Sequence, residues 1–366
     1  MGSNSFGKSL VLTTAGESHG KGYVAILDGV PSGYEISIEK IQHDLALRAP
    51  GRSLYSSLRK ESDQVDFISG LYQGKTTGAP LSFFIPNLDH RPDDYTFTRT
   101  VFRPGHADYT YKGKYGHVDL NGGGRASARE TVCRVVAGSI AKQVLKTENI
   151  DVLAYVRQIH DMRANLLTLS IKDARQIVLD DPLGSADSQM SKSWQSLIQK
   201  AIDEKDSLSG SVCFVIDPMI PFLGRPVYEK LTNTISNALM TIPAVKGVIF
   251  GELDSIQTKK GSAFNDPMFI SQEGIGFCKN DAAGLLGGIS THQPIYGEVF
   301  FKPPSSIAKE QNTMDRTISF EGRHDPVVVH RARIVVESML WLVLLDELLL
   351  EFGSKYFFER QLCHTQ

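Results

Sequence analysis

Residues 103–138 read RPGHADYTYKGKYGHVDLNGGGRASARETVCRVVAG, and the pattern of this stretch changes half-way along. The first half shows no apolar alternation and is rich in Gly, Tyr and Asp, so it predicts a loop. The second half has Ser127 and Glu130 in the S-x-x-E spacing of a capping box, and apolar residues then recur at helical spacing. The stretch therefore predicts a loop that leads into the N-terminus of a helix.

This stretch also carries a local surplus of positive charge. Six basic side chains stand against three acidic ones: Arg103, Lys112, Lys114, Arg125, Arg129 and Arg134 against Asp108, Asp119 and Glu130. The glycines at 122–124 let the backbone approach a ligand closely, and the free N–H groups of a helix N-terminus favour an anion. Two interpretations remain open: a solvated basic loop before an ordinary surface helix, and a site for a phosphorylated small molecule.

The composition of the chain favours a cytoplasmic protein with a small anionic ligand. Its 366 residues could form one or two domains, and a net charge of −2 gives no general attraction for nucleic acid or a membrane surface. The four cysteines, at 133, 213, 278 and 363, form no C-x-x-C pair, and the first residues lack a signal-peptide core. The longest apolar run, residues 339–345, is too short to cross a membrane. We therefore expect free thiols, no nucleic acid and no membrane.

Strand and helix patterns alternate along the chain without a regular β–α–β repeat. Predicted strands are residues 10–14, 23–27, 67–72, 81–85, 152–156, 212–216 and 297–301. Helices are predicted from Ser37, Ser191, Pro226 and Asp325, the last with Pro326 in its first position. Residues 335–350 are apolar nearly all round, which is typical of a helix inside a large core or a subunit interface. The pattern predicts an α/β protein of mixed layers, in a single domain of residues 1–366.

Three motifs resemble well-known signatures but lack the required context. GESHG at 16–20 fits a nucleophile elbow, but a strand rather than a helix follows it. GKT at 74–76 lacks the glycine that a P-loop needs five residues earlier, and GGGRAS at 122–127 lacks the third glycine of a dinucleotide site. No histidine or cysteine spacing indicates a metal. The glycines of GESHG favour instead a tight loop that aims the imidazole of His19.

His106 lies close in sequence to Arg103, among the basic residues of the central stretch. An imidazolium next to a phosphate ester is a suitable general acid for the departure of phosphate. The same residue could instead be an ordinary structural histidine. A second basic group follows the first predicted helix, where it is either a solvated linker or a further anion-binding surface: Arg48, Arg52, Arg59 and Lys60.

Several of these motifs together resemble the signature sequences of chorismate synthases. They are GESHG at 16–20, RPGHADYTYKGKYG at 103–116, GGGRASARET at 122–131, LGGIS at 286–290 and GRHDP at 322–326, and the resemblance extends over nearly the whole chain. It implies an α/β sandwich of antiparallel or mixed sheets with helices, usually as a homotetramer. It also implies a lyase of the shikimate pathway that makes chorismate from 5-enolpyruvylshikimate 3-phosphate by 1,4-anti elimination of phosphate. Reduced FMN would be the cofactor, and whether the protein reduces it with NAD(P)H or depends on a separate reductase stays open.

By motif match, the resemblance assigns roles to individual residues. His106 would protonate the departing phosphate, His19 would protonate the reduced flavin, and Asp325 with Ser127 would handle the proton at the flavin N5 edge. Arg48, Arg129 and Arg331 would bind the charged groups of the substrate. The flavin-binding positions would be Arg125, Ala126, Ser127, Ala244, Gly287, Lys302, Pro303, Pro304, Ser305, Ser306 and Arg323.

The chain also departs from the family pattern. Leu47, Ala49 and Leu54 stand where many relatives carry arginine, and Ala126, Pro243 and Pro304 replace a usual serine, asparagine and threonine. These departures predict a less basic cover over the substrate, for which Arg52 could compensate, and looser contacts to the flavin. An alternative function is a non-catalytic flavin or phosphometabolite-binding protein on the same scaffold. The trio His19, His106 and Asp325 favours the enzyme, because binding alone does not need it.

Overall fold

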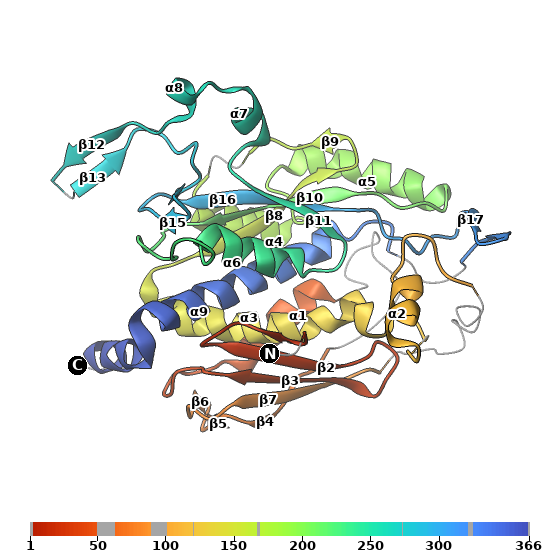
Figure 1. Cartoon of the computed structure of the whole chain (residues 1–366), viewed down its shortest axis with the longest axis horizontal. Coiled ribbons are helices and arrows are strands. Elements are labelled where there is room, and N and C mark those ends of the chain that lie inside the picture. The colour runs from red at the N-terminus through yellow and green to blue at the C-terminus, as the bar shows by residue number, and fades with distance from the viewer. Residues whose placement is uncertain are drawn as a thin grey trace.

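The computed structural model describes residues 3–49, 63–88, 101–119, 121–166, 169–272, 274–320 and 325–364, the last seven by their backbone alone (Figure 1). The predictions for Arg52, Leu54, Arg59, Lys60 and Arg323 fall outside these ranges. Within them, two five-stranded antiparallel sheets enclose a layer of helices. The predicted α/β class of mixed layers is confirmed.

The first sheet contains the N-terminal strands. Its order is β1 (Ser5–Phe6), β2 (Val11–Gly16), β3 (Gly22–Asp28), β7 (Leu81–Pro86) and β4 (Asp66–Ser69), with antiparallel neighbours throughout. The predicted strand at 67–72 is interrupted, because Gly70 turns the chain with a φ of 90° before the hairpin of β5 (Leu71–Tyr72) and β6 (Lys75–Thr76). A Cβ at Gly70 would lie only 2.6 Å from the Cα of Leu81, so no other residue fits there without movement.

The second sheet has the order β11 (Val245–Phe250), β16 (Ile295–Phe301), β10 (Gly210–Ile216), β8 (Val152–Ile159) and β9 (Met162–Arg163). Both faces of β8 are buried: Val152 and Ala154 belong to the main core, whereas Leu153 and Tyr155 pack with α4 (Ile171–Asp180) on the opposite face. This explains why β8 reads as a continuous apolar run rather than an alternating one. The helix α5 (Ser188–Asp203) lies beside β9.

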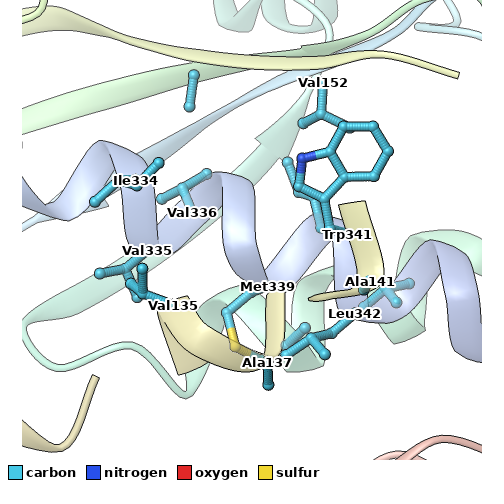
Figure 2. Close-up of a cluster of buried hydrophobic side chains, with 14 of the residues drawn as sticks. Val135, Ala137, Ala141, Val152, Ile334, Val335, Val336, Met339, Trp341 and Leu342 are labelled. Atoms are coloured by element: carbon cyan, nitrogen blue, oxygen red, sulfur yellow. The ribbon is translucent and has the colours of Figure 1, made fainter. Parts of the chain in front are cut away.

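The middle layer consists of α1 (Ile38–Arg48), α3 (Thr131–Val144) and α9 (Val329–His364), and α6 (Leu231–Met240) packs against α9 (Figure 1). α9 lies under β8 and β10, while α3 contacts β2 and β3 of the other sheet. Figure 2 shows Val135 and Ala141 of α3 next to Val335 and Leu342 of α9. The two helices come very close at Gly138, where a Cβ would lie 2.5 Å from the Cα of Ser338.

Two of the acidic residues that interrupt the apolar surface of α9 have backbone partners. Asp346 accepts hydrogen bonds from the backbone N–H groups of residues 8–10 at 2.7–3.0 Å, which ties the N-terminal segment to the core. Glu337 accepts from the N–H of Ala154 at 2.9 Å, and burial raises the pKa of its carboxyl group. A buried carboxyl group is tolerated where a donor meets it. The predicted burial of residues 335–350 is confirmed.

The central stretch departs from its prediction in two ways. Residues expected to form a loop form α2 (Asp108–Tyr115), which has no apolar stripe and buries only Asp108, so hydrophobic spacing could not reveal it. Ser127 does act as an N-cap and accepts from the N–H of Arg129 at 3.2 Å, but it caps a short 3-10 helix, η3 (Ala128–Glu130), ahead of α3. Glu130 does not complete a capping box; its carboxylate accepts hydrogen bonds from Thr14 and Arg134.

Two helix starts predicted from prolines are wrong. α6 begins at Leu231, because the chain around Pro226 makes a turn in which the N–H of Arg225 bonds to the carbonyl of Glu229. α9 begins at Val329, so neither Asp325 nor Pro326 stands in its first turn. Proline and N-cap residues such as aspartate also favour turns, so their presence does not by itself mark the start of a helix. The helix expected from Ser191 begins at Ser188, whereas Ser37 caps α1 as predicted.

The remaining elements are short. They are η2 (Gly124–Ala126), η4 (Leu145–Glu148), α7 (Leu253–Thr258), α8 (Gly261–Phe264), β12 (Met268–Ser271), β13 (Gly274–Phe277), β14 (Leu285–Leu286), β15 (Ile289–Ser290), β17 (Gln311–Thr313) and β18 (Arg316–Ile318). The β12–β13 hairpin projects from the body of the molecule (Figure 1). Of the helices in the described ranges, none combines the length and apolarity needed to cross a membrane.

Candidate active site

A cavity of about 910 Å³ lies between the first sheet and the central stretch. Its walls come from the end of β2, from α2 and from the glycines at 122–124, and both His106 and Arg125 line it. Small-molecule sites commonly have volumes of about 300–1,000 Å³. The ligand site expected at this loop therefore coincides with a cavity of suitable size.

His106 is held by two residues close to it in sequence. Its Nδ1 lies 2.6 Å from Oδ1 of Asp108. The guanidinium of Arg103 binds the same carboxylate, with Nε 2.8 Å from Oδ2 and Nη2 2.7 Å from Oδ1. Burial alone would raise the pKa of Asp108, but the hydrogen bonds from Arg103 and His106 outweigh it and hold that pKa far below its usual range. Asp108 is therefore an anion that accepts the Nδ1–H of His106.

His19 lies in the loop between β2 and β3, with Nδ1 3.0 Å from Oγ of Ser18. Asn87 fixes this loop, because its Nδ2 donates to two loop carbonyls at 2.9 and 3.0 Å. The imidazole packs against Gly122, whose φ is 68° and where a Cβ would lie 2.3 Å from Nδ1. Arg103 donates to the carbonyl of Gly122 at 2.7 Å, so this glycine connects the surroundings of the two histidines.

Arg48 and Arg129 share one carboxylate in the protein interior. Nη2 of Arg48 and Nη1 of Arg129 donate to the two oxygens of Asp63, and all three side chains are buried. Burial lowers the pKa of Arg48, which Asp63 opposes. Burial would raise the pKa of Asp63, but the two guanidinium groups outweigh it and lower that pKa. Because Nε of Arg129 also donates to Oδ1 of Asn87 at 3.1 Å, this pair is linked to the His19 loop.

Arg331 joins the same network from α9. Its Nε donates to the carbonyl of Arg48 at 2.9 Å, and its Nη1 donates to Oδ2 of Asp325 at 2.7 Å. The structure thus brings together Arg48, Arg129 and Arg331 and places Asp325 next to them. A continuous path of contacts runs from His106 through Gly122, the His19 loop and Asp63 to Asp325.

Arg125 stands between the cavity and the first sheet. Its Nη2 donates to the carbonyl of Thr14 at 2.9 Å. Its Nη1 is buried, lies 3.9 Å from Oε1 of Glu130 and makes no hydrogen bond in the part of the chain that the structure describes. A buried donor without an acceptor at a cavity wall is available to a polar ligand. Ala126 lines the cavity next to it.

The segment 302–306 borders the same region from the end of β16. Nζ of Lys302 and Oγ of Ser305 donate to the carbonyl of Gly105 at 3.0 and 2.7 Å, and Nη1 of Arg103 donates to Oγ of Ser306 at 3.4 Å. Burial and the repulsion of Lys246 lower the pKa of Lys302.

Of the other predicted flavin positions, Ala244, Pro303 and Pro304 lie in or next to this segment, whereas Gly287 does not. The carbonyl of Ala244 accepts a hydrogen bond from the backbone N–H of Lys302 at 2.9 Å, and the carbonyl of Pro304 accepts one from the hydroxyl group of Ser207 at 2.7 Å. Pro303 lies between Lys302 and Pro304 in the same segment. Gly287 lies in the turn between β14 and β15 and does not line the cavity.

In comparison with known proteins, a family model described as chorismate synthase matches residues 10–349. The chain belongs to the chorismate synthase family. Chorismate synthases of Porphyromonas gingivalis and Wolinella succinogenes are 43% and 42% identical over 353 and 359 residues, which are 94% and 96% of this chain and 95% and 96% of theirs. A crystal structure of chorismate synthase matches with a TM-score of 0.77 and 28% identity, over 98% of this chain and 99% of that one. As a member of the chorismate synthase family, the protein is an enzyme, a carbon–oxygen lyase that acts on a phosphate ester.

Sequence reasoning gave no role to four residues that hold the candidate site together: Asp63, Asn87, Arg103 and Asp108. The H-x-D spacing of His106 and Asp108 was an available signal, because a carboxylate two residues away can reach the same imidazole. Asp63 and Asn87 gave no local signal, since their partners are far away in sequence. Among the described residues, no group of three or more His, Cys, Asp or Glu side chains is placed to hold a metal ion.

Two of the departures from the family pattern lie together. Leu47 and Ala49 line a second cavity, of about 260 Å³, with His330, Arg331 and Arg333 of α9 on its other side. Positive charge therefore reaches this cavity from α9 rather than from the end of α1. Burial, with the charge of Arg331, lowers the pKa of His330 to about 4, and neither ring nitrogen has a hydrogen-bond partner within the described ranges.

Proposed function

We propose that the protein converts 5-enolpyruvylshikimate 3-phosphate into chorismate by FMN-dependent 1,4-anti elimination of phosphate. The observation that carries this proposal is the path of contacts that joins His106 to the cluster of Arg48, Arg129 and Arg331. A substrate with a phosphate and carboxylates needs several cations to bind it. A departing phosphate needs a proton donor as well. The path of contacts therefore joins a proton donor to the cations that would bind the substrate.

The residues around the large cavity fit a flavin mononucleotide. Arg125 presents a buried N–H donor without an acceptor in the described ranges, and the glycines at 122–124 line the cavity next to it. Lys302 and Ser305 supply a cation and a hydroxyl group next to Gly105, which suits a phosphate. When bound, reduced FMN would lend electron density to the substrate and recover it, so that the reaction has no net redox change.

The side chains of this protein would bind, orient and exchange protons with the substrate. The C–O bond breaks and its electron pair leaves with phosphate. One ring C–H bond breaks, its electron pair forms the new double bond, and its proton would be taken up at the Asp325 end of the path, so atoms and charge balance. His106 gives a proton to the phosphate oxygen as that group departs. Arg48, Arg129 and Arg331 hold the anionic groups. At the other end of the path, His19 would hold a proton at a ring nitrogen and Asp325 would hold one at its carboxylate. The hydroxyl group of Ser127 accepts the backbone N–H of Arg129 and so helps to fix this end.

The decisive experiment is an anaerobic assay with enolpyruvylshikimate phosphate and chemically reduced FMN. We expect chorismate absorbance and phosphate to appear together, with reduced FMN needed in catalytic amount because the elimination is redox-neutral. His106→Ala should lower turnover by about 10²–10⁴-fold, the usual contribution of a positioned general acid. Substrate affinity should change much less, because the arginines remain. Consumption of reduced flavin in step with product would refute the proposal.

We further propose a single domain of residues 1–366 that acts as a cytoplasmic homotetramer. Support for one domain comes from the family match across residues 10–349. Support for association comes from the projecting β12–β13 hairpin, where Ile270 is 91% exposed and Ile275 is 60% exposed, since large apolar side chains on a projecting arm favour contact with another molecule. Light scattering of the purified protein would test this, and a monomer at micromolar concentration would contradict it.

A further inference from the structure

We propose that Asp108 is a positioning residue for His106, which keeps the Nδ1 proton in place and makes Nε2 the nitrogen that delivers a proton to the leaving group. This inference rests on the proposed function, because it concerns the general acid of that reaction. The assignment of the proton between the two ring nitrogens decides whether His106 can act as the donor.

The geometry around Asp108 is the first support. The distance of 2.6 Å between Oδ1 and Nδ1 of His106 is that of a short, charge-assisted hydrogen bond. Asp108 is also the first residue of α2, where a negative charge is favoured by the free N–H groups of the helix. The backbone N–H of Arg103 donates to Oδ2 at 3.1 Å. The carboxylate therefore has fixed partners on every side and cannot rotate away from the imidazole.

Arg103 is the second support, because it keeps Asp108 ionised. Its guanidinium binds both carboxylate oxygens and is itself anchored to the carbonyl of Gly122. An ionised carboxylate can only accept, so the proton between Asp108 and His106 stays on Nδ1. Nη2 of Arg103 also lies 3.0 Å from Nδ1, where it would need an acceptor, but Nδ1 cannot accept while it donates its proton to Asp108, the closer partner at 2.6 Å.

The proton balance of the step follows from this arrangement. With Nδ1–H committed to Asp108, Nε2 carries a proton only in the imidazolium form. When phosphate departs, the Nε2–H bond breaks, an O–H bond forms on phosphate, and His106 becomes the neutral Nδ1–H tautomer. Solvent then restores the proton on Nε2. Asp108 stabilises the imidazolium before transfer and fixes the tautomer after it, as a buried carboxylate does in other acid–base pairs.

Other charged groups face the same cavity and must be separated from Asp108 in any test. Glu17, His117, Asp119 and Arg125 stand on the cavity wall, and Lys302 approaches from the β16 side next to Gly105. Asp119 is the most useful of these, since it carries the same charge as Asp108 and accepts a hydrogen bond from the N–H of Asn121 instead of from the imidazole. Asp119→Asn is therefore a matched control for the removal of one negative charge.

The central variant is Asp108→Asn, assayed for steady-state turnover from pH 5 to 9. Asp108 accepts three hydrogen bonds from Arg103 and one from His106, whereas asparagine has a single acceptor oxygen. Its amide N–H would therefore face either a donor of Arg103 or Nδ1 of His106, and facing Nδ1 would favour the wrong tautomer of the imidazole. We expect turnover to fall by about 10²–10³-fold while KM for the substrate changes less than about 3-fold. The alkaline limb of the turnover profile should move to lower pH by about one unit, because the imidazolium loses its anionic partner.

Two further variants define the interpretation. Asp108→Glu restores a carboxylate and should recover part of the turnover and the position of the alkaline limb. Asp119→Asn should leave the limb within about 0.3 pH unit of the wild type, since Asp119 binds the backbone N–H of Asn121 rather than the imidazole. An Asp108→Asn profile that coincides with the wild type, or a limb that moves equally in Asp119→Asn, would overturn the proposal.

A measurement without turnover separates this inference from the proposed function. In wild-type protein labelled with ¹⁵N-histidine, the resonances of His106, assigned by their loss in His106→Ala, should show a proton on Nδ1 in the neutral ring. The tautomer is read on the wild-type protein, and His106→Ala serves only to assign the resonances. A neutral ring protonated on Nε2 would overturn the positioning role. An Nδ1–H ring in a protein that forms no chorismate would uphold the role of Asp108 and refute the proposed function instead.

Discussion

Replacement of Asp63 by asparagine tests the buried arginine network that the proposed function needs. The change keeps the shape of the side chain and removes one charge. Arg48 and Arg129 would lose the carboxylate that they share, although only 3% and 4% of their side chains are exposed. Removing one partner of a buried ion pair costs about 3–5 kcal/mol, because the remaining charge stays buried. We therefore expect Asp63→Asn to lower the free energy of unfolding by about 4 kcal/mol.

This loss can be converted into a melting temperature. An unfolding entropy of about 2.1 cal/mol/K per residue gives roughly 0.8 kcal/mol/K for the 366 residues, so about 4 kcal/mol lowers the Tm by ~5 °C. The pH dependence has a definite sign. The pKa of Asp63 is lowered in the folded protein, so its stabilisation is present above the unfolded pKa, near 4, and disappears as the pH falls through the folded pKa. The difference between variant and wild type should therefore shrink in acid.

Anions should distinguish this explanation from a general loss of packing. Sulfate or phosphate can replace part of the missing negative charge beside Arg48 and Arg129, so the variant should gain more Tm than the wild type when chloride is exchanged for sulfate at constant ionic strength. Scanning calorimetry measures this directly. Asp66→Asn, an exposed carboxylate on β4, is the control and should change stability by less than about 0.5 kcal/mol. A loss below about 1 kcal/mol in Asp63→Asn, or an equal response to sulfate in both proteins, would refute the reasoning.

Three other predictions concern different parts of the molecule. His330 has a pKa of about 4 when folded and 6.5 when unfolded, so the unfolded chain takes up its proton first as the pH falls. The unfolding free energy should therefore fall by up to about 3 kcal/mol from pH 6.5 to 4. Urea titrations at several pH values measure this dependence. It should vanish in His330→Phe and persist in a variant of the exposed His43. Gly138→Ala should destabilise the protein by about 1–3 kcal/mol, because the added methyl group would collide with α9. Gly113→Ala, whose methyl group would meet no atom within 4 Å, should instead stabilise α2 by up to about 1 kcal/mol. Equal melting temperatures for the two variants would contradict this. Asp325→Asn retains an acceptor for a guanidinium but cannot take a proton, so turnover should drop by about 10²–10⁴-fold at unchanged Tm, and full activity would remove Asp325 from the proton path.

Local sequence patterns predicted those helices that are determined by neighbouring residues. Ser37 before an amphipathic run predicted the start of α1, and its Oγ accepts the N–H of Lys40 as a cap should. The apolar circumference of residues 335–350 predicted a central helix, because a helix without a polar face must be covered on all sides. The family motifs then brought forward the residues of the candidate site, which hydrophobic periodicity could not have selected.

What could not be predicted depends on contacts between distant segments. Asp63 joins Arg48 and Arg129 across 15 and 66 positions of the chain, and no spacing rule reports such a pair. The helix α2 was missed for a different reason: it has no apolar stripe, and its one buried residue, Asp108, binds the nearby Arg103. Asp325 was given a capping role from its position before a proline, but the structure directs its carboxylate to Arg331.

The net charge of the arginine cluster bears on how the proposed anionic substrate would bind. Arg48, Arg129 and Arg331 stand against Asp63 and Asp325, so these five groups carry a surplus of one positive charge before any ligand arrives. A long basic side chain loses about 1.5–2 kcal/mol of conformational freedom when it is fixed, and a flexible set of three would lose this on binding. Here Asp63 and the carbonyl of Arg48 already fix the guanidinium groups, so that loss occurs on folding. On the proposed function, the substrate would meet cations already in place and contribute the anionic groups that the surplus requires. Asp63 would then be a determinant of affinity, although it would repel the ligand on its own.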